Sequence, residues 1–515
     1  MRLSGDTQEQ LPADVVRPGY DVVATRTGIV HLGIGAFHRA HQAVYTDDAM
    51  AMAGGDWRII GVSLRSDTVR DQLAPQDGLY TVTQRSADAP QTRLIGAIAR
   101  VIVAPEEPEA VITALADPQT RIVTLTVTEK GYYQTAEGGL DIDHQTIAGE
   151  LAGGKPVTIY GFLARALQRR RAADAGGVTL LSCDNLSENG QRLRALLLDF
   201  LERSDPGLAQ WTADHCSFPS SMVDRIVPAT TDADLKSLAE GIGMDDRGAV
   251  FTEPFTQWVI EDHFAAGRPA WEQVGAQMVA DVRPYETAKL RMLNGAHSAL
   301  AYIGLLNGHD YVHQAVNDPA IRPLIERLLL EEAAPTIDAA EGQDLEAYAA
   351  DLLARFDNPA LNHRLIQIAM DGSQKIPQRW LETLHHHRRD GRACPALEER
   401  RQCNAHACPV DCATTEWGEW GLCSASCAGG SHERFRAVDV AAAFEGAPCP
   451  VLLMLKACHT QLCPADCEAS SWGTWSACDK SCGGGGSRLR TRVVTHAAVR
   501  WGKACPVLEE RQLCG

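Results

Sequence analysis

The cysteines of this chain are confined almost entirely to its last quarter. Of 16 cysteines, only Cys183 and Cys216 precede residue 394, and the other 14 fall within residues 394–515. Cysteines crowded in this way are typical of small secreted domains that disulfides hold together. A long segment with almost no cysteine is not typical of such domains. The sequence therefore predicts two modules of different redox character in one chain.

Length and charge narrow the classes of function. A chain of 515 residues is too long for one hydrophobic core and predicts about three domains. The formal net charge of −18 argues against nucleic acid and anionic membranes as partners. We expect no membrane-spanning helix, since no apolar run is long enough, and the first residues lack the apolar core of a signal peptide.

A turn typical of dinucleotide-binding folds follows the first apolar segment. Residues 28–35 read GIVHLGIG, and the sequence after them, AFHRAHQAVYTDDAMAM, has helical character. Gly33 and Gly35 would let the backbone approach a pyrophosphate, whose charge a helix N-terminus stabilises. His38 stands where the fingerprint has its third glycine, so this motif alone is a weak indication.

A second apolar strand, residues 58–64, ends close to an acidic residue. Asp67 at this place can accept hydrogen bonds from the adenosine ribose and disfavours a 2′-phosphate, which predicts NAD rather than NADP. Arg65 beside it leaves that preference open. Asp67 could equally cap the helix that follows.

Further strands alternate with helices in the first 280 residues. Apolar, β-branched segments at 121–128 and 178–183 and helical patterns at 107–116 and 159–172 predict an α/β fold with a doubly wound, mostly parallel sheet. Ligands bind at the carboxyl ends of such strands. Asn185 lies at one of these ends and is placed to meet a ligand, although a turn-forming asparagine is the alternative.

The stretch YETAKLRMLNGAHSAL, residues 285–300, combines an amine, an amide and an imidazole. Taken as an α-helix, it places Asn294 and His297 on one face and Lys289 one to two turns before them, within reach of Glu286. A partly desolvated lysine can act as a base, and the N–H groups beside it can hold an oxygen whose charge changes. The alternative is a half-buried helix whose polar residues are capped or paired.

From residue 281 the pattern becomes helical, with apolar spacing through 286–306, 311–332, 344–356 and 360–370. We interpret these residues as a second, largely α-helical domain that covers the cofactor cleft. The active site would then lie between the two domains, which is a common place for one.

Seven segments in order carry a resemblance to a known family. They read GIVHLGIGAFHRAHQAVY, TVTEKGYY, SCDNLSENG, FPSSMVDRIVP, EPFTQWVIEDHF, GRPAWEQVGAQ and KLRMLNGAH. Together they resemble the long-chain polyol dehydrogenases, which include mannitol 2-dehydrogenase and fructuronate reductase. The resemblance implies a zinc-independent, NAD-linked oxidoreductase that interconverts a sugar alcohol or aldonate with its 2-keto sugar or uronate.

The resemblance also implies roles for single residues. Lys289 matches the general base, Asn185 and Asn294 the oxyanion-binding amides, and His297 the residue that orients the reacting oxygen. The expected substrate-binding residues are Lys130, Asp224, Glu286, Arg291 and Lys375. The expected cofactor-binding residues are Gly33, Gly35, Phe37, His38, Arg65, Asp67 and Thr128. No metal site is expected.

The substrate is less clear than the reaction. Polyol enzymes of the family usually carry glycine where Lys130 stands, and a carboxylate substrate would need a cation such as Lys130, Arg291 or Lys375. Each of these residues could also be a solvated surface charge. The pattern favours a uronate or aldonate over a polyol.

The cysteines of the last quarter recur with a period of 55 or 56 residues. The matched pairs are Cys412/Cys467, Cys423/Cys478, Cys427/Cys482, Cys449/Cys505 and Cys458/Cys514. Each unit begins with Trp-x-x-Trp and later carries spaced arginines, and these features resemble thrombospondin type 1 repeats. The resemblance implies a ladder of stacked tryptophans and arginines and the disulfides Cys412–Cys449, Cys423–Cys458 and Cys427–Cys463.

The expected domains are 25–277 for NAD binding, 278–384 for a shortened helical domain, 385–393 for a polar linker with three histidines, 394–411 for part of a repeat, 412–465 for a full repeat and 466–515 for an incomplete one. Cys394, Cys403, Cys408 and Cys482 would then lack partners.

Two classes of function follow. One is an NAD-dependent oxidoreductase acting in the cytoplasm on a small sugar, sugar alcohol or uronate. The other is a secreted protein whose repeats bind glycans or proteins and whose dehydrogenase domain is inactive.

Overall fold

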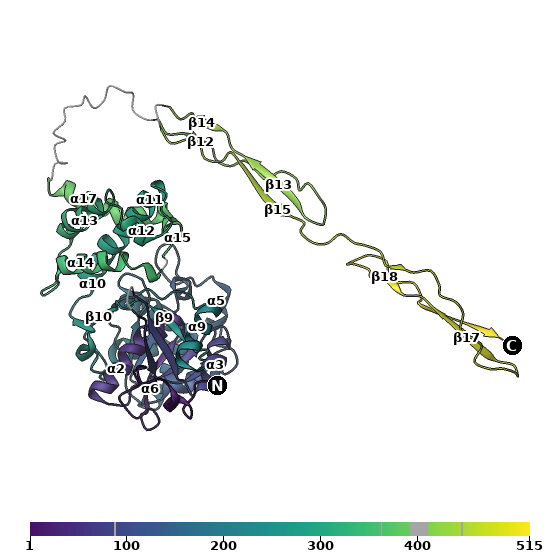
Figure 1. Ribbon diagram of the computed structural model, residues 1–515, viewed down its shortest axis with the longest axis horizontal. Helices are drawn as coiled ribbons and strands as arrows, with labels where there is room; N and C mark the ends of the chain where they lie inside the picture. Colours follow the sequence, from purple (N-terminus) through teal and green to yellow (C-terminus); the bar gives the residue numbers. More distant parts are fainter. Residues whose placement is uncertain (87–88, 362, 392–409, 444–445, 515) are drawn as a thin grey trace. The chain divides into compact units, whose positions relative to one another are not determined.

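The computed structural model describes residues 1–86, 89–361, 363–391, 410–443 and 446–514 (Figure 1). The chain divides into two compact units, residues 1–393 and residues 394–515. The first unit holds a sheet lobe and a helical lobe, and the second holds the cysteine-rich repeats.

A five-stranded parallel sheet organises the first lobe. Its strands stand in the order β5-β2-β1-β6-β7, and every neighbouring pair is parallel. Their bounds are β1 Thr27–Leu32, β2 Arg58–Ser63, β5 Ile98–Val103, β6 Ile122–Leu125 and β7 Thr179–Ser182. The order reverses between β1 and β6, and ligands bind at such a switch point. The predicted doubly wound sheet is confirmed.

Successive strand residues point to opposite faces of this sheet, and a core lies on each face. Val30 of β1 joins one core and Ile29 the other. Helices α4 Pro108–Ala116, α6 Ile159–Ala172 and α7 Asn189–Ser204 cover the first face, and α2 Gln42–Ala53 covers the second. Both faces are buried, which explains why the strands are apolar without alternation.

Two small sheets and short helices complete the lobe. The sheets are β4-β3-β9 (Gln91–Ile95, Tyr80–Gln84, Val250–Thr252) and β11-β10-β8 (Gln277–Val279, Gln257–Glu261, Ser221–Asp224). The helices are α1 Ala36–Ala40, α3 Thr68–Leu73, α5 Gln145–Leu151, α8 Pro206–His215 and α9 Asp232–Ile242. Strand β8 ends at Asp224, beside the helical lobe.

The second lobe is helical and forms a layer of its own (Figure 1). Its main helices are α10 Arg283–Ala288, α11 Gly295–Leu306, α12 Val312–Val316, α13 Arg322–Arg327, α14 Leu345–Phe356, α15 Leu365–Ala369, α16 Gly372–Ile376 and α17 Glu382–Arg389. Three π-helical segments, Lys289–Asn294, Leu328–Ala333 and Pro377–Leu381, continue some of them. Leu300, Leu329 and Leu352 meet in their common core.

The histidine-rich junction differs from the prediction. Residues 385–389 were expected to begin a linker, but they form the last turns of α17. The helix continues because no glycine or proline interrupts the segment before Gly391, and His387 Nε2 donates to Glu332 O at 2.7 Å. Polar composition alone did not reveal this contact with another helix.

Each repeat of the second unit is a pair of thin antiparallel ribbons. In the first, β12 Ala413–Thr414 pairs with β14 Val438–Val440, and β13 Gly430–Phe435 with β15 Leu453–Cys458. In the second, β16 Glu468–Ala469 pairs with β18 Val494–His496, and β17 Gly486–Thr491 with β19 Glu509–Cys514. No described residue of 412–463 is buried.

Disulfides and stacked side chains take the place of a core. The three predicted bonds, Cys412–Cys449, Cys423–Cys458 and Cys427–Cys463, are confirmed, and Cys467–Cys505 and Cys478–Cys514 repeat the first two. Cys482 is exposed and has no disulfide partner in the described part of the chain. Cys394, Cys403 and Cys408 lie outside the described residues.

The predicted ladder is also present. The guanidinium of Arg434 lies 4.9 Å from the Trp417 ring centre and 4.7 Å from that of Trp420, and Arg436 continues the stack on Trp417 at 4.4 Å. In the second repeat Arg488, Arg490 and Arg492 stack in the same way on Trp475 and Trp472. Cation–π contacts of this kind contribute to stability even at exposed sites.

Candidate active site

A polar cavity of about 470 Å³ lies between the sheet lobe and the helical lobe. The loop after β7 and the end of β8 supply one wall, and the helices from α10 to the π-helical segment 377–381 supply the other. Its charged and amide-bearing lining residues are Glu129, Asp184, Asn185, Arg192, Glu286, Lys289, Asn294, Lys375, Gln378 and Arg379. Concave sites with a few convergent polar groups are where small ligands bind.

Lys289 is held from the sheet side of this cavity. Its Nζ donates to Asn185 Oδ1 at 2.7 Å and to the backbone carbonyl of Val223 at 2.6 Å. Burial lowers the pKa of Lys289, the Arg355 guanidinium lowers it further, and Asp224 and Glu286 oppose both. The amine therefore sits where it can release its proton more readily than a surface lysine.

The loop that carries Asn185 is fixed on both sides. The Asp184 carboxylate accepts from Val127 N at 3.1 Å, Thr128 N at 2.8 Å and Tyr132 Oη at 2.9 Å. Across the cavity, Glu286 accepts from the backbone N–H of Glu188 at 3.0 Å. The amide carbonyl of Asn185 accepts from Lys289, which leaves its NH₂ group as the donor for a ligand oxygen.

The chain between Lys289 and Asn294 is a π-helix, not the α-helix that the sequence pattern predicted. In a π-helix the hydrogen bonds join residues five apart, so Lys289 and Asn294 come to the same side, and both line the cavity. Arg379 Nη1 donates to the backbone carbonyl of Asn294 at 3.2 Å and holds this turn in place. An α-helix would point the two side chains in different directions.

His297 lies behind the cavity wall and not among its lining residues. The ring is 9% exposed and packs against Phe356 at 4.7 Å and His363 at 5.2 Å between ring centres. Its Nε2 is buried without a partner in the described part of the chain. Burial holds its pKa well below the usual range, so the imidazole is neutral.

The structure separates the five expected substrate-binding residues into two groups. Glu286 and Lys375 line the cavity, and burial raises the pKa of Glu286 to about 7. Asp224, Lys130 and Arg291 do not line it: Asp224 is paired with Arg355, Lys130 is exposed, and Arg291 donates to Thr336 O and faces Glu382. Tertiary pairing of this kind is invisible in the local sequence.

The glycine turn after β1 fits a dinucleotide. Gly33 has a φ of 97°, and a Cβ here would lie 2.2 Å from Thr126 O, so the turn requires glycine. At Gly35 an added Cβ would meet nothing nearer than 3.8 Å, so space above this residue is open. The first N–H groups of α1, which starts at Ala36, have no partner within the helix and can meet a phosphate.

His38, which replaces the third glycine, has a packing role. It is fully buried and stacks on His31 of β1 with ring centres 3.4 Å apart, and it was expected to contact the cofactor. The third glycine of the fingerprint permits close packing of helix and strand, and two flat imidazoles supply that contact here. Burial lowers the pKa of His31 to about 3, so it is neutral. Phe37 stacks on His41 beside them.

The other expected cofactor residues lie at the carboxyl ends of β2 and β6. Arg65 and Asp67 are exposed after β2, and the Asp67 side chain makes no capping bond to α3. Thr128 has a φ of 64°, unusual for a residue with a Cβ, and its N–H is held by Asp184. The glycine turn, the exposed carboxylate of Asp67, which lies 3.8 Å from Arg70 Nη2, and the strand ends together fit a dinucleotide.

Two groups of functional residues were missed in the sequence. Arg355 and Glu253 join the lobes beside Lys289, and Arg192, Gln378 and Arg379 line the cavity. Glu253 stands in the quoted segment EPFTQW, which was a signal that could have marked it. Nothing local distinguished Arg355 from other arginines on a helix. In the described part of the chain, no three His, Cys, Asp or Glu side chains could together hold a metal ion.

Comparison with protein families assigns each part of the chain. Residues 27–273 match the mannitol dehydrogenase Rossmann domain and residues 281–399 the mannitol dehydrogenase C-terminal domain. Residues 412–463 match the spondin-like TSP1 domain and residues 470–514 the thrombospondin type 1 domain. The second match runs past the end of α17 into residues that the structure does not describe.

Individual relatives cover the dehydrogenase module. Two proteins of Escherichia coli (strain K12), the uncharacterized oxidoreductase YeiQ and D-mannonate oxidoreductase, are 46% and 45% identical to this chain. Each alignment spans 73% of this chain and 78% or 79% of the relative. The ternary complex of Pseudomonas fluorescens mannitol 2-dehydrogenase with NAD and D-mannitol superimposes with a TM-score of 0.69 at 41% identity, over 76% of this chain and 81% of that one.

Proposed function

The chain belongs to the mannitol dehydrogenase family, and thrombospondin type 1 domains follow its dehydrogenase module. On that premise, we propose that Lys289 is the base of an NAD-dependent, zinc-independent dehydrogenase. The reaction class is the oxidation of a CH–OH group. The environment of Lys289 supports this assignment. The lysine is buried and has a lowered pKa, its amine donates to Asn185, and it lines the same cavity as Asn294.

The residues divide the chemical work between them. Neutral Lys289 accepts the proton of the substrate hydroxyl. The NH₂ groups of Asn185 and Asn294 donate to the same oxygen while its charge builds up, and a preorganised donor pair of this kind lowers the barrier. His297 was predicted to orient that oxygen, but it does not line the cavity, so we assign the contact with the oxygen to the two amides alone.

The glycine turn and the ends of β2 and β6 would hold the cofactor. Gly33, Gly35 and the start of α1 would hold the pyrophosphate, Asp67 would accept from the adenosine ribose, and Thr128 would contact the cofactor from the end of β6. When bound, NAD accepts the hydride from the carbinol carbon. The exposed Asp67 would meet a 2′-phosphate with like charge, so NAD is favoured over NADP.

The charge of the cavity supports an anionic substrate. Arg192, Lys375 and Arg379 line it together with Lys289, and Glu129, Asp184 and Glu286 are the acids among its lining residues. Burial raises the pKa of Glu286 to about 7, so its negative charge is reduced at neutral pH, and Arg192, Lys375 and Arg379 then outnumber the two other acids. We therefore favour an aldonate, with the 2-keto uronate as product, over a neutral polyol.

A comparison of two substrates tests this choice. We expect kcat/KM with NAD to be about 10- to 100-fold higher for D-mannonate than for D-mannitol, because a hydrogen bond to a charged group contributes roughly 1.5–3 kcal/mol. Lys375→Met should remove most of this preference and leave the slow mannitol reaction little changed. NADH absorbance measures both rates, and treatment with EDTA should change neither. Equal rates on the two substrates would contradict the anionic preference.

The rates of substrate oxidation and of the reverse reduction should depend on pH with opposite signs. Oxidation needs the neutral amine of Lys289, which is populated above its pKa, and reduction needs the ammonium, which is populated below it. Because burial lowers the pKa of Lys289, the change should fall below the pH at which a surface lysine titrates. We expect oxidation to rise about tenfold per pH unit up to that pKa. Profiles of kcat/KM that rise together in both directions would contradict a lysine acid–base.

The thrombospondin domains point to a separate binding role. Such domains are typical of extracellular proteins, and disulfides require an oxidising compartment. None of the described helices is long and apolar enough to cross a bilayer. We propose a glycan or a protein as the ligand of the repeats. The reading in which the dehydrogenase domain is inactive is not favoured, because the catalytic groups are assembled.

A further inference from the structure

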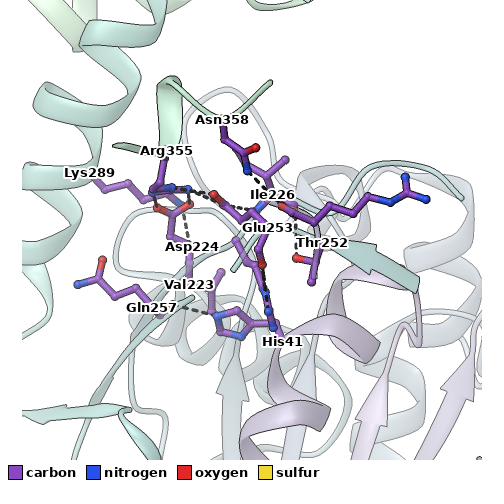
Figure 2. A network of polar contacts seen from close by, with 12 residues as sticks. His41, Val223, Asp224, Ile226, Thr252, Glu253, Gln257, Lys289, Arg355 and Asn358 are labelled. Carbon is purple, nitrogen blue, oxygen red and sulfur yellow. Dashed lines mark hydrogen bonds and ion pairs between the residues drawn. The ribbon is translucent and has the colours of Figure 1, made fainter. Parts of the chain in front are cut away.

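A buried cluster of three charges joins the two lobes beside Lys289 (Figure 2). Arg355, in the last turn of α14, donates from Nη1 to Asp224 Oδ2 at 2.6 Å and from Nη2 to Asp224 Oδ1 at 3.3 Å. The same guanidinium donates from Nη2 to Glu253 Oε1 at 2.8 Å and from Nε to Glu253 Oε2 at 3.0 Å. One arginine thus binds two carboxylates, each through both oxygens.

The side chains of the cluster are buried, and their positions are fixed by further contacts. The side chains of Arg355, Asp224 and Glu253 are 5%, 8% and 1% exposed. The guanidinium also lies 3.9 Å from the centre of the Phe255 ring. Glu253 is fixed independently, because its Oε1 accepts from Ile226 N at 2.7 Å. Buried charges are tolerated only when they are paired, so removal of Arg355 takes the guanidinium counter-charge away from two buried carboxylates.

The cluster is linked through the backbone of β8 to the group that holds the proposed base. Asp224 is the last residue of β8, and the residue before it is Val223, whose carbonyl accepts from Lys289 Nζ. We infer that Arg355 is a positioning residue: by binding Asp224 and Glu253 across the lobes, it fixes the end of β8 that holds the Lys289 amine and pairs with the carboxylate next to Val223 in the chain. This inference rests on the proposed function of Lys289.

The charges around Lys289 determine whether a substitution in the cluster raises or lowers the pKa of its amine. Asp224 at the end of β8 and Glu286 on α10 favour the ammonium, and Arg355 on α14 disfavours it. The further charged groups of the cavity are Glu129, Asp184, Arg192, Lys375 and Arg379. Without Arg355, the Asp224 charge is no longer neutralised, and the pKa of Lys289 rises. Without the Asp224 charge, the pKa of Lys289 falls.

Two substitutions should therefore move the pH profile of oxidation in opposite directions. In Arg355→Met, we expect the alkaline limb of kcat/KM to move up by about one pH unit or more, as for an opposite charge a few ångströms away. The rate should then fall at least tenfold near neutral pH and recover partly at high pH. In Asp224→Asn, the limb should move to lower pH. Arg355→Lys should shift the limb less than Arg355→Met, because it keeps the cation.

Glu253→Gln is the matched control. This change weakens the same buried cluster, but Glu253 is not adjacent in sequence to Val223, whose carbonyl holds the Lys289 amine, so the limb should move less than in Arg355→Met and Asp224→Asn. If Glu253→Gln shifts the limb as far as Arg355→Met, or if Arg355→Met and Asp224→Asn lower the rate equally at every pH, the cluster is only structural and the inference is overturned.

A direct titration separates this inference from the proposed function. Competitive acetylation of the full chain, read at the peptide that carries Lys289 by mass spectrometry, gives the pKa of that amine without any substrate. Opposite shifts in Arg355→Met and Asp224→Asn support the inference even if neither sugar is oxidised, a result that would overturn only the proposed function. Asp224→Asn, a neutral isostere, keeps the test decisive if Arg355→Met fails to fold. Unchanged titration in Asp224→Asn would overturn the inference.

Discussion

Replacement of Lys289 by methionine should abolish most of the dehydrogenase activity while the cofactor still binds. Proton transfer by a positioned side chain accelerates a reaction about 10²- to 10⁴-fold, and methionine offers no group that can take its place. We expect kcat to fall by that factor in both directions and the pH dependence of oxidation to flatten. The affinity for NADH, measured by its fluorescence, should change little, because Gly33 and Gly35 of the glycine turn are not among the residues that line the cavity around Lys289.

Lys236 provides the matched control. It is an exposed lysine on α9, and its change to methionine removes the same charge without touching the cavity. Full activity is expected of Lys236→Met. Should Lys289→Met retain more than a tenth of the wild-type kcat, another group takes the proton and the proposed role of Lys289 is wrong.

Loss of one disulfide should unfold the first repeat. The bond Cys423–Cys458 ties the loop before β13 to the last residue of β15, and its half-cystines are 35 residues apart. Removing a native disulfide from a small domain typically costs 2–5 kcal/mol. A repeat without buried residues in its described part has little other stabilisation to offset this. In the full chain carrying Cys423→Ser and Cys458→Ser, we expect trypsin to cleave within 412–463 at least ten times faster.

Cys482→Ser is the control for this change. Its thiol is exposed and makes no disulfide within the described residues, so cleavage of the first repeat should proceed at the wild-type rate. The dehydrogenase module serves as an internal reference, since its two cysteines are free. Equal protease resistance of the double serine variant and the wild type would show that the tryptophan–arginine ladder suffices to hold the ribbons.

Much of the fold could be predicted because it depends on local patterns. The helix expected at 159–172 is α6 with the same bounds, and the strand expected at 58–64 is β2 at 58–63. Each of these elements buries a continuous apolar face. The spacing of its apolar residues and the turn-forming residues at its ends are therefore enough to predict it. The helix expected after the glycine turn breaks at His41, where the backbone leaves the helical region with a φ of −123° and a ψ of −88°.

The site was only partly predictable, because its residues depend on distant partners. Lys289, Asn185 and Asn294 were named, and the structure brings them to one cavity. The Lys-x4-Asn spacing of Lys289 and Asn294 was taken as part of an α-helix, although five residues is the hydrogen-bond spacing of a π-helix. Arg355 meets Asp224 across 131 positions in the chain, and no pattern within either segment indicates that pairing.

The thinness of the repeats has a consequence for how the chain responds to temperature. The heat capacity increment of unfolding grows with the apolar area that becomes hydrated. The dehydrogenase module, with packed cores on both faces of its sheet, therefore has a strongly curved stability profile and weakens in the cold as well as in the heat. The first repeat has no buried residue in its described part and exposes less apolar area when it opens, so its stability should vary less steeply with temperature.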